Sequence, residues 1–190
     1  MSDKAARKKQ YILDTARTVF AKKGFKNVTM KDIVEACDIS RGGLYIYFDS
    51  TESIFLECLK QSDTSVADPL KGHSAGDALV MFLNELKKEI LTKDNDLSAA
   101  VYEYLFLKYS DGASSDYFKE RYDAKVNILT GILEEGSESG DLYCEDCALT
   151  ARNIMYTMEG LKIGAATFGV TEKEVDMHLL YILSGLIVEE

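Results

Sequence analysis

Residues 29–48 read TMKDIVEACDISRGGLYIYF, and this stretch decides the fold. Thr29 is a good helix N-cap, and Asp32 stands three residues later in the position of a capping-box acid. Asp38 tolerates left-handed backbone and marks a break, after which Ser40 can cap a second helix. Two short helices joined by so tight a turn form a helix-turn-helix unit, whose second helix enters the major groove of DNA.

The second helix, expected over residues 40–47, carries side chains suited to DNA. Each of its two adjacent glycines costs about 1 kcal/mol relative to alanine, a cost that is tolerated where a backbone must approach something closely. Arg41 can fork onto guanine, Ile46 can touch a thymine methyl, and the tyrosines can reach phosphate oxygens. The spacing alone fits a surface turn between core helices equally well. The candidate DNA-contacting residues are Thr29, Lys31, Ser40, Arg41, Gly42, Gly43, Tyr45, Ile46 and Tyr47.

Three motifs resemble the N-terminal domain of the TetR family of transcriptional regulators over about residues 8–56. They are Thr29-x-x-Asp32-Ile33, Ser40-x-Gly42-Gly43-Leu44-Tyr45-x-Tyr47-Phe48, and Phe20-x-x-x-Gly24-Phe25 in the preceding helix. Two positions depart from the family pattern: Asp38 stands where the turn usually has glycine, and Thr51 stands where a phosphate-binding lysine is common. Because Thr51 replaces that lysine, the resemblance does not imply this contact to the DNA backbone, although it still implies that the second helix enters the major groove.

The composition fits an all-helical protein. Apolar residues make up 46% of the 190 residues, and Pro69 is the single proline, which favours long helices. Together with the resemblance, this predicts an all-α fold of about nine helices. We expect a three-helix helix-turn-helix DNA-binding domain over residues 1–48, followed by a larger helical ligand-binding and dimerisation domain over residues 49–190.

The net charge of −10 is divided unequally along the chain. Residues 1–48 hold ten Lys/Arg and five Asp/Glu, which is +5, while the remainder holds twelve and twenty-seven, which is −15. The first 48 residues thus form a small basic head, and the remaining residues form an acidic body. This division restricts the attraction for phosphate to one end of the chain. The N-terminal Lys4, Arg7, Lys8 and Lys9 also fit a solvated tail.

Two regions after residue 48 have expected roles, one as a connector between the domains and one as a dimer interface. A helix over residues 50–67 is the expected connector between the two domains. Helices over about residues 145–168 and 172–188 carry apolar side chains on more than one side, which exceeds what a monomer core needs. The resemblance implies that these two helices form a four-helix bundle with those of a second copy. The resulting homodimer would face a palindromic operator in double-stranded DNA.

The resemblance also implies an effector pocket in the body. Residues 97–109 are apolar nearly all round, so we expect that helix to be buried. Aromatic and thioether side chains at helical spacing are commonly core residues, but they also suit an apolar pocket with a few polar groups. A carboxylate in that pocket would favour a cationic or hydroxyl-bearing ligand. The candidate ligand-binding residues are Phe82, Tyr102, Glu103, Phe106, Tyr122, Met155, Met158 and Glu159.

Other chemistry has little support in the sequence. Cys144-x-x-Cys147 has no second pair and no nearby histidine, so neither a metal nor a cofactor is expected, and a thiol switch is a minor alternative to incidental cysteines. No nucleophile triad or glycine-rich phosphate loop appears, so we do not expect an enzyme. The absence of an 18-residue apolar stretch and of an N-terminal signal region predicts no membrane contact and a cytoplasmic location.

These observations predict a regulator that binds operator DNA as a homodimer. It is expected to be a repressor that a small, largely apolar effector releases from a palindromic site. The alternative, supported by Thr51 and the acidic total, is a helical small-molecule-binding protein that no longer binds DNA.

Overall fold

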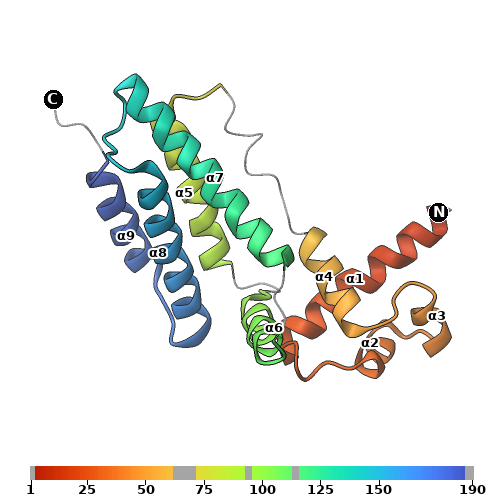
Figure 1. Ribbon diagram of the computed structural model, residues 1–190. Helices are drawn as coiled ribbons and strands as arrows, with labels where there is room; N and C mark the ends of the chain where they lie inside the picture. The colour runs from red at the N-terminus through yellow and green to blue at the C-terminus, as the bar shows by residue number, and fades with distance from the viewer. Residues whose placement is uncertain (1–2, 62–71, 93–95, 113–115, 187–190) are drawn as a thin grey trace. The chain divides into compact units, whose positions relative to one another are not determined.

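A computed structural model describes residues 3–61, 72–92, 96–112 and 116–186. Within these ranges the chain forms nine α-helices and no strand, which confirms the expected fold class (Figure 1). The helices are α1 (Asp3–Lys23), α2 (Met30–Cys37), α3 (Arg41–Tyr45), α4 (Thr51–Gln61), α5 (Ala75–Leu91), α6 (Ser98–Ser110), α7 (Asp116–Ser139), α8 (Cys147–Thr167) and α9 (Glu172–Ser184).

The chain divides into two units that each bury their own core. Unit 1 comprises residues 1–64 and 93–114, and unit 2 comprises residues 65–92 and 115–190. Unit 1 therefore contains α1 to α4 and also α6, a helix that follows α5 in sequence. The expected functional boundary at residue 48 differs from this division and remains a prediction.

An aromatic cluster lies at the centre of unit 1. Phe20 of α1, Phe25 of the following turn and Phe55 of α4 lie with ring centroids 4.9–6.1 Å apart. Tyr104 of α6 completes the cluster, with its ring 4.9 Å from that of Phe25 and edge-on to it. Such ring pairs contribute about 0.5–1.5 kcal/mol each beyond the apolar area that they bury. This cluster joins three helices that are distant in the sequence.

Polar contacts hold α6 to the rest of unit 1. Glu52 at the start of α4 accepts a hydrogen bond from the Tyr104 hydroxyl at 2.8 Å and pairs with Lys108 at 2.6 Å. The Glu103 carboxylate accepts the backbone N–H of Lys26 at 3.1 Å. It also lies directly over Gly24, where an added β-carbon would stand only 2.4 Å from a carboxylate oxygen. Position 24 favours glycine because of its positive φ of 75°, and a β-carbon there would also displace the Glu103 carboxylate.

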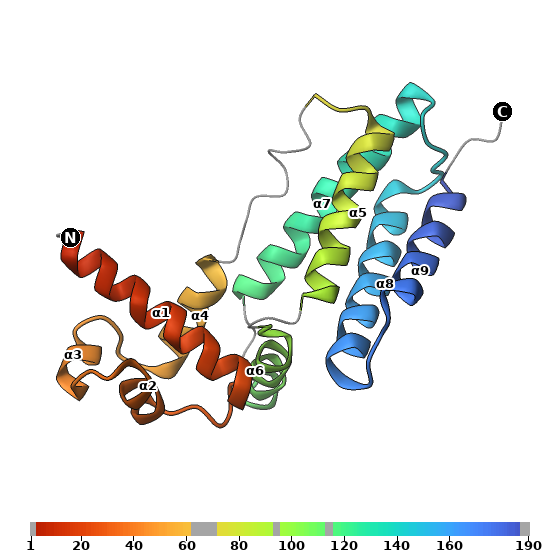
Figure 2. The same cartoon turned by 180° about the vertical axis from the view of Figure 1, so that it is seen from behind.

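Unit 2 is a bundle of α5, α7, α8 and α9 (Figure 2). Both views place α9 beside α8 at one edge of the bundle. The core is formed by the apolar stripes of these helices, and it includes Phe82 of α5, Leu129 and Leu133 of α7, and Met155 of α8. These stripes repeat at three- and four-residue spacing, so each helix presents one continuous apolar face to the others.

The observed helices correct several expected boundaries. The second helix of the helix-turn-helix unit was expected over residues 40–47, but α3 is regular only over Arg41–Tyr45 and continues as hydrogen-bonded turns to Phe48. The connector is regular over Thr51–Gln61, and its expected remainder, 62–67, lies outside the described residues. The two C-terminal helices match their expected positions to within a few residues at each end over the described part of the chain.

The expectation that residues 97–109 are buried all round is wrong. Phe106 and Tyr109 are 69% and 83% exposed, and Leu107 is 36% exposed. The buried face of α6 is narrow and includes Ala100 and Tyr104. Apolar residues on every side of a helix thus did not predict burial here, because α6 packs through one side within unit 1.

No helix in the described ranges is both long enough and apolar enough to cross a membrane.

Replacing Asp38 with glycine should stabilise the protein. Asp38 closes α2 in the left-handed conformation (φ 49°, ψ 49°), as its position in the turn predicted. A non-glycine residue there costs about 1 kcal/mol, so the free energy of unfolding in urea should rise by about that amount for Asp38→Gly. Asp38→Ala keeps the β-carbon and should give no gain. An equal gain from both variants would contradict a conformational cause.

The Asp32→Asn variant should lose stability in a pH-dependent way. The ammonium of Lys23 and the hydroxyl and N–H of Thr29 hold the pKa of the Asp32 carboxyl far below its usual range. A lowered folded-state pKa stabilises the protein above the unfolded value of about 3.9, and this contribution declines as the pH falls below it. The difference in Tm between Asp32→Asn and the parent should therefore be largest near neutral pH and shrink towards pH 3. A difference that does not change with pH would exclude ionisation as the cause.

Candidate nucleic-acid interface

Side-chain caps set the geometry of the helix-turn-helix unit. Thr29 caps α2: its hydroxyl accepts the Asp32 N–H at 3.3 Å, while the Asp32 carboxylate accepts the Thr29 N–H at 2.8 Å. Asp38 then turns the chain, and the Ser40 hydroxyl caps α3 by accepting the Gly43 N–H at 3.1 Å. These local contacts fix where α3 begins and which way it points.

The two sides of α3 differ sharply in exposure. Leu44 and Phe48 are 0% and 6% exposed and anchor the helix to the core of unit 1. Ile46 is 78% exposed and Tyr45 is 43% exposed, a combination that is unusual for large apolar side chains on a short helix. Arg41 lies on the same exposed side, with its guanidinium carbon 5.4 Å from the centre of the Tyr45 ring. The outer side of α3 thus offers one forked cation and an apolar tip to a partner.

The glycine pair leaves the backbone of α3 open. A β-carbon on Gly42 would meet no atom within 4 Å, whereas one on Gly43 would approach the Ser40 hydroxyl oxygen at 3.1 Å. Packing within the chain therefore explains Gly43 in part, but it does not explain Gly42. A bare backbone at an exposed position suits close approach by another molecule.

The remaining candidate contacts surround α3. Lys31 is exposed, and its ion pair with Glu35 is long at 3.6 Å, so its ammonium can turn to a phosphate. Tyr47 is half-buried, and Thr51 stands half-buried at the first position of α4. The Thr29 hydroxyl is engaged in capping. The DNA contacts assigned to these side chains remain predictions.

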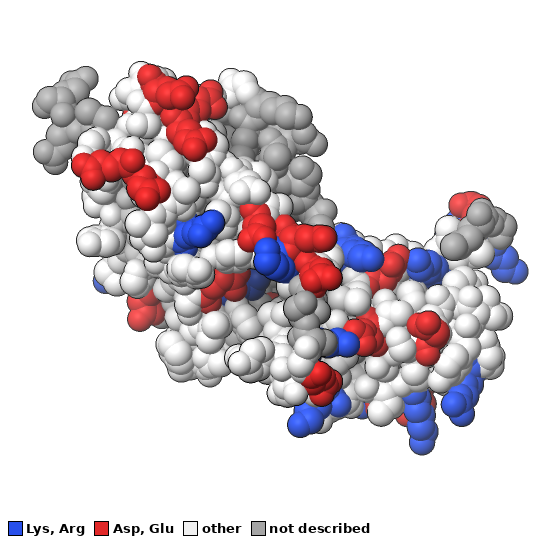
Figure 3. All heavy atoms as spheres, viewed as in Figure 1, with Lys and Arg blue, Asp and Glu red and all other residues white. Residues whose placement is uncertain are grey.

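Charge is distributed differently over the two units. In the view of Figure 3, lysine and arginine side chains gather along the edge of unit 1 that holds α2 and α3. Acidic side chains gather over the end of α7 in unit 2. Counted from the sequence, residues 1–48 have a net charge of +5 and the remainder −15, so the positive charge of unit 1 lies in its first 48 residues, which include α1 to α3. Attraction for a polyanion is therefore concentrated on that part of unit 1.

The expected effector residues fall into two groups. Tyr102, Glu103 and Phe106 belong to α6 of unit 1, where Glu103 already binds the Lys26 N–H and Phe106 is exposed. The residues in unit 2 are Phe82, Tyr122, Met155, Met158 and Glu159, of which Phe82, Met155 and Met158 are buried in its core. The Tyr122 hydroxyl oxygen is buried and has no hydrogen-bond partner among the described residues. Ligand contact by either group remains a prediction.

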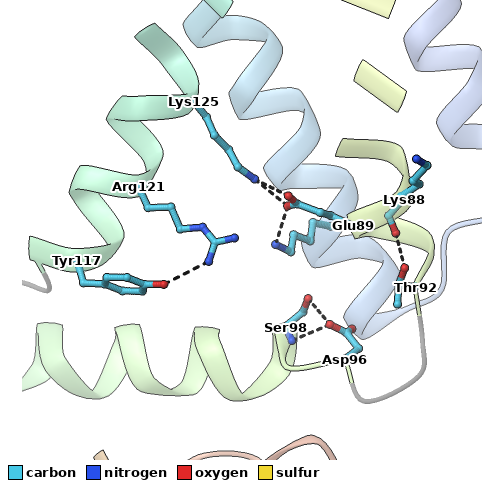
Figure 4. Close-up of polar contacts among 9 residues, drawn as sticks. Lys88, Glu89, Thr92, Asp96, Ser98, Tyr117, Arg121 and Lys125 are labelled. Atoms are coloured by element: carbon cyan, nitrogen blue, oxygen red, sulfur yellow. Dashed lines mark hydrogen bonds and ion pairs between the residues drawn. The ribbon is translucent and has the colours of Figure 1, made fainter. Parts of the chain in front are cut away.

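Sequence reasoning missed a charged cluster inside unit 2. Glu89 of α5 binds Lys125 of α7 through both carboxylate oxygens, at 2.7 and 2.8 Å (Figure 4). Lys162 of α8 lies 3.7 Å from the same carboxylate, and Arg121 extends from α7 towards it. The signal was present in the sequence, because positions 89, 125 and 162 each fall on an apolar helix stripe.

The C-x-x-C pair has the properties of ordinary cysteines. Cys144 and Cys147 are both half-buried and free, and burial together with the neighbouring Cys144 raises the pKa of Cys147 to about 11. A thiol with so high a pKa is a poor nucleophile at neutral pH. Among the described residues, no group of three or more potential metal ligands comes together.

An exposed, capped second helix on a three-helix head defines a helix-turn-helix DNA-binding protein, and comparison with known proteins identifies the family. Residues 12–58 match the model described as bacterial regulatory proteins, tetR family, and residues 78–176 match that of the tetracyclin repressor-like C-terminal domain. The chain therefore belongs to the TetR family of transcriptional regulators, whose members bind operator DNA and small-molecule effectors and act as dimers.

Individual relatives agree with this assignment. The chain is 29% identical to the HTH-type transcriptional regulator YfiR of Bacillus subtilis, over 94% of this chain and 92% of YfiR. It is 33% identical to IcaR of Staphylococcus aureus, the HTH-type negative transcriptional regulator of the biofilm operon icaADBC, over 71% of this chain and 59% of IcaR. The fold matches that of NalD, the secondary repressor of the MexAB-OprM multidrug efflux pump in Pseudomonas aeruginosa. That match has a TM-score of 0.76 at 14% identity, over 100% of both chains.

Gly42→Ala should weaken DNA binding without lowering the stability of the protein. The added methyl group meets nothing within the chain, so the free energy of unfolding should stay constant or rise by up to about 1 kcal/mol. The same methyl group would stand between the backbone and the bases, so we expect the Kd for an operator selected from random duplexes to rise about tenfold or more. Gly76→Ala on α5, which is equally unobstructed, is the matched control and should leave the Kd unchanged. Equal DNA binding by Gly42→Ala and the parent would show that the backbone of α3 does not approach the duplex closely.

Proposed function

We propose that the protein is a homodimeric repressor that binds a palindromic operator and is released from it by a small, largely apolar effector. The observation that carries this proposal is the outer side of α3, where Arg41, Tyr45 and Ile46 face outward from a buried anchor of Leu44 and Phe48. Family membership supports the regulator class, and the roles of IcaR as a negative regulator and of NalD as a repressor support repression.

Unpartnered apolar surface on α8 and α9 supports the homodimer. Large apolar side chains on these helices and the loop between them are 43–81% exposed, namely Leu149, Tyr156, Ile163, Phe168, Met177, Leu180 and Tyr181. Exposed apolar side chains grouped on two neighbouring helices are typical of a protein–protein interface. A groove of about 690 Å³ also runs between α8 and α9, lined in part by Ile154, Tyr181 and Ile182. A second copy applying the same surface would cover it with two-fold symmetry.

The two-fold symmetry would set the form of the operator. Two copies of α3 would lie one helical turn of DNA apart, roughly 34–36 Å, or a multiple of this spacing, and would read inverted half-sites. An effector that prefers a dimer with a different spacing would shift the population away from the DNA-binding form. Tyr122, Met155 and Met158 of unit 2 are proposed to contact its apolar part.

The proposal is tested by a gel shift with DNA from upstream of the protein's own gene. The expected result is one retarded complex whose footprint covers an inverted repeat. Failure to select any duplex from a random pool would overturn the proposal and favour a small-molecule-binding protein without DNA binding.

Arg41→Ala and Tyr47→Phe should weaken binding in different ways. Loss of a forked arginine contact to guanine removes about 1–3 kcal/mol of discrimination at one position of each half-site, while the other positions keep their preference. Loss of the Tyr47 hydroxyl, which we assign to phosphate, should weaken binding to all sequences alike. Selection from random duplexes with each variant measures both effects. If Arg41→Ala retained the full operator preference, the base contact assigned to Arg41 would be wrong.

Charges placed on α9 should split the dimer. Leu180→Glu together with Tyr181→Glu places two carboxylates where we expect hot-spot contacts, so the dimer Kd should rise about thirtyfold or more, which is about 2 kcal/mol. Sedimentation equilibrium measures this change, and operator affinity should fall with it. Val80→Glu on α5 adds a charge at another exposed apolar site and serves as the control. A double variant that remains dimeric would place the interface elsewhere.

A further inference from the structure

The charged cluster inside unit 2 has an excess of cations. Lys125 and Lys162 both contact the Glu89 carboxylate, so two ammonium groups face one carboxylate. Arg121 acts electrostatically on both Glu89 and Lys125 and also donates a hydrogen bond to the Tyr117 hydroxyl. The side chains of Lys125, Lys162 and Glu89 are only 14%, 27% and 32% exposed. We call these four residues the cationic cluster.

Burial makes this excess of positive charge unfavourable. Burial raises the pKa of Glu89, but the ammonium groups of Lys125 and Lys162 outweigh this effect and hold its pKa below the usual range. The pKa of Lys125 is lowered, because burial and the neighbouring cations disfavour its charged form more than Glu89 favours it. A half-buried site that holds surplus positive charge gains from a further anion.

The geometry leaves hydrogen-bonding capacity for that anion. A lysine ammonium has three donors, and Lys162 lies 3.7 Å from Glu89, beyond hydrogen-bond distance. Both carboxylate oxygens of Glu89 already accept hydrogen bonds from the Lys125 ammonium. A cationic ligand would therefore have to displace Lys125 from this carboxylate. Solvent reaches all three side chains, as their partial exposure shows.

Apolar side chains stand next to the cluster along the same helices. On α8, buried Met158 precedes Lys162 by one turn, and on α5, buried Leu86 precedes Glu89 by one turn. On α7, Tyr122 precedes Lys125 by three residues, and its ring stacks on that of Tyr156 with the ring centroids 6.1 Å apart. Each helix thus carries an apolar or aromatic side chain about one turn from the charge.

From this arrangement we propose that unit 2 recognises an amphiphilic anion, whose carboxylate or phosphate binds Lys125 and Lys162 and whose apolar part lies against Tyr122 and Met158. This inference rests on the proposed function in that it assigns the chemical class of the effector. It reverses the charge expected from the sequence, where Glu103 and Glu159 suggested a cationic or hydroxyl-bearing ligand. Glu103 is engaged by the Lys26 N–H in unit 1, and the carboxylate of the cluster is outnumbered by its cations.

The test uses four ligands with the same ten-carbon tail and the full chain without DNA. Decanoate and decyl phosphate carry the two possible anionic groups, while decanol and decyltrimethylammonium are the neutral and cationic counterparts. Isothermal titration below the micellar range should show one or both anions binding about tenfold or more tightly than the other two ligands, as charge-assisted hydrogen bonds imply. The ratio between decanoate and decyl phosphate identifies which anionic group the site prefers.

Variants locate the binding site. Lys162→Met keeps the length of the side chain and removes its charge, so it should weaken binding of the preferred anion about tenfold or more while leaving decanol unaffected. Glu89→Gln removes the competing carboxylate and should leave anion binding unchanged or strengthened. Lys88→Met, at an exposed lysine adjacent to Glu89 in sequence, is the matched control and should have no effect. Circular dichroism melting verifies that each variant folds.

Several outcomes would overturn the proposal. These are tighter binding of decyltrimethylammonium than of both anions, loss of binding in Glu89→Gln with retention in Lys162→Met, or no binding of either anion. A gel shift with the same ligands tests separately whether ligand binding releases the protein from its operator. If an anion binds through Lys162 but operator binding persists, the cationic cluster stands as an anion site and the release mechanism fails.

Discussion

The packing of aromatic rings at the centre of unit 1 is the interaction on which the DNA-binding surface depends. Phe20, Phe25 and Phe55 come from three separate segments, and Tyr104 closes the cluster from α6. Leu44 and Phe48 are buried in the same unit, so the inner side of α3 is fixed while its outer side stays exposed. Because α3 is regular over only five residues, its orientation comes from this packing together with the caps around it, and not from its own stability.

Local chemistry explains why much of unit 1 was predictable from the sequence. The capping box of Thr29 and Asp32, the left-handed Asp38 and the Ser40 cap each depend on residues within three or four positions. The inward positions of Leu44 and Phe48 follow from helical spacing alone. The family resemblance rested on these same residues, and the match over residues 12–58 confirms it.

The unpredicted features depend on contacts between segments that are distant in the sequence. That Glu103 accepts the Lys26 N–H and lies over Gly24 follows from no local pattern. The apolar periphery of α6 suggested burial, yet Phe106 is exposed because α6 packs within unit 1 through the side that carries Ala100 and Tyr104. The cationic cluster was not predicted, because Glu89, Lys125 and Lys162 come from three helices and no local pattern shows that they meet. An ionisable residue at a stripe position is better regarded as a candidate site, since its burial needs compensation.

The inclusion of α6 in unit 1 has a consequence for how the protein is made. The DNA-binding half is assembled from two stretches of chain, with all of α5 synthesised between them. During translation the aromatic rings of α1 and α4 therefore emerge well before Tyr104, and they lack one neighbour until the ribosome has passed α6. A fragment cut after α4 would lack Tyr104 and with it one ring of the aromatic cluster, so a fragment meant to keep that cluster whole must extend through α6.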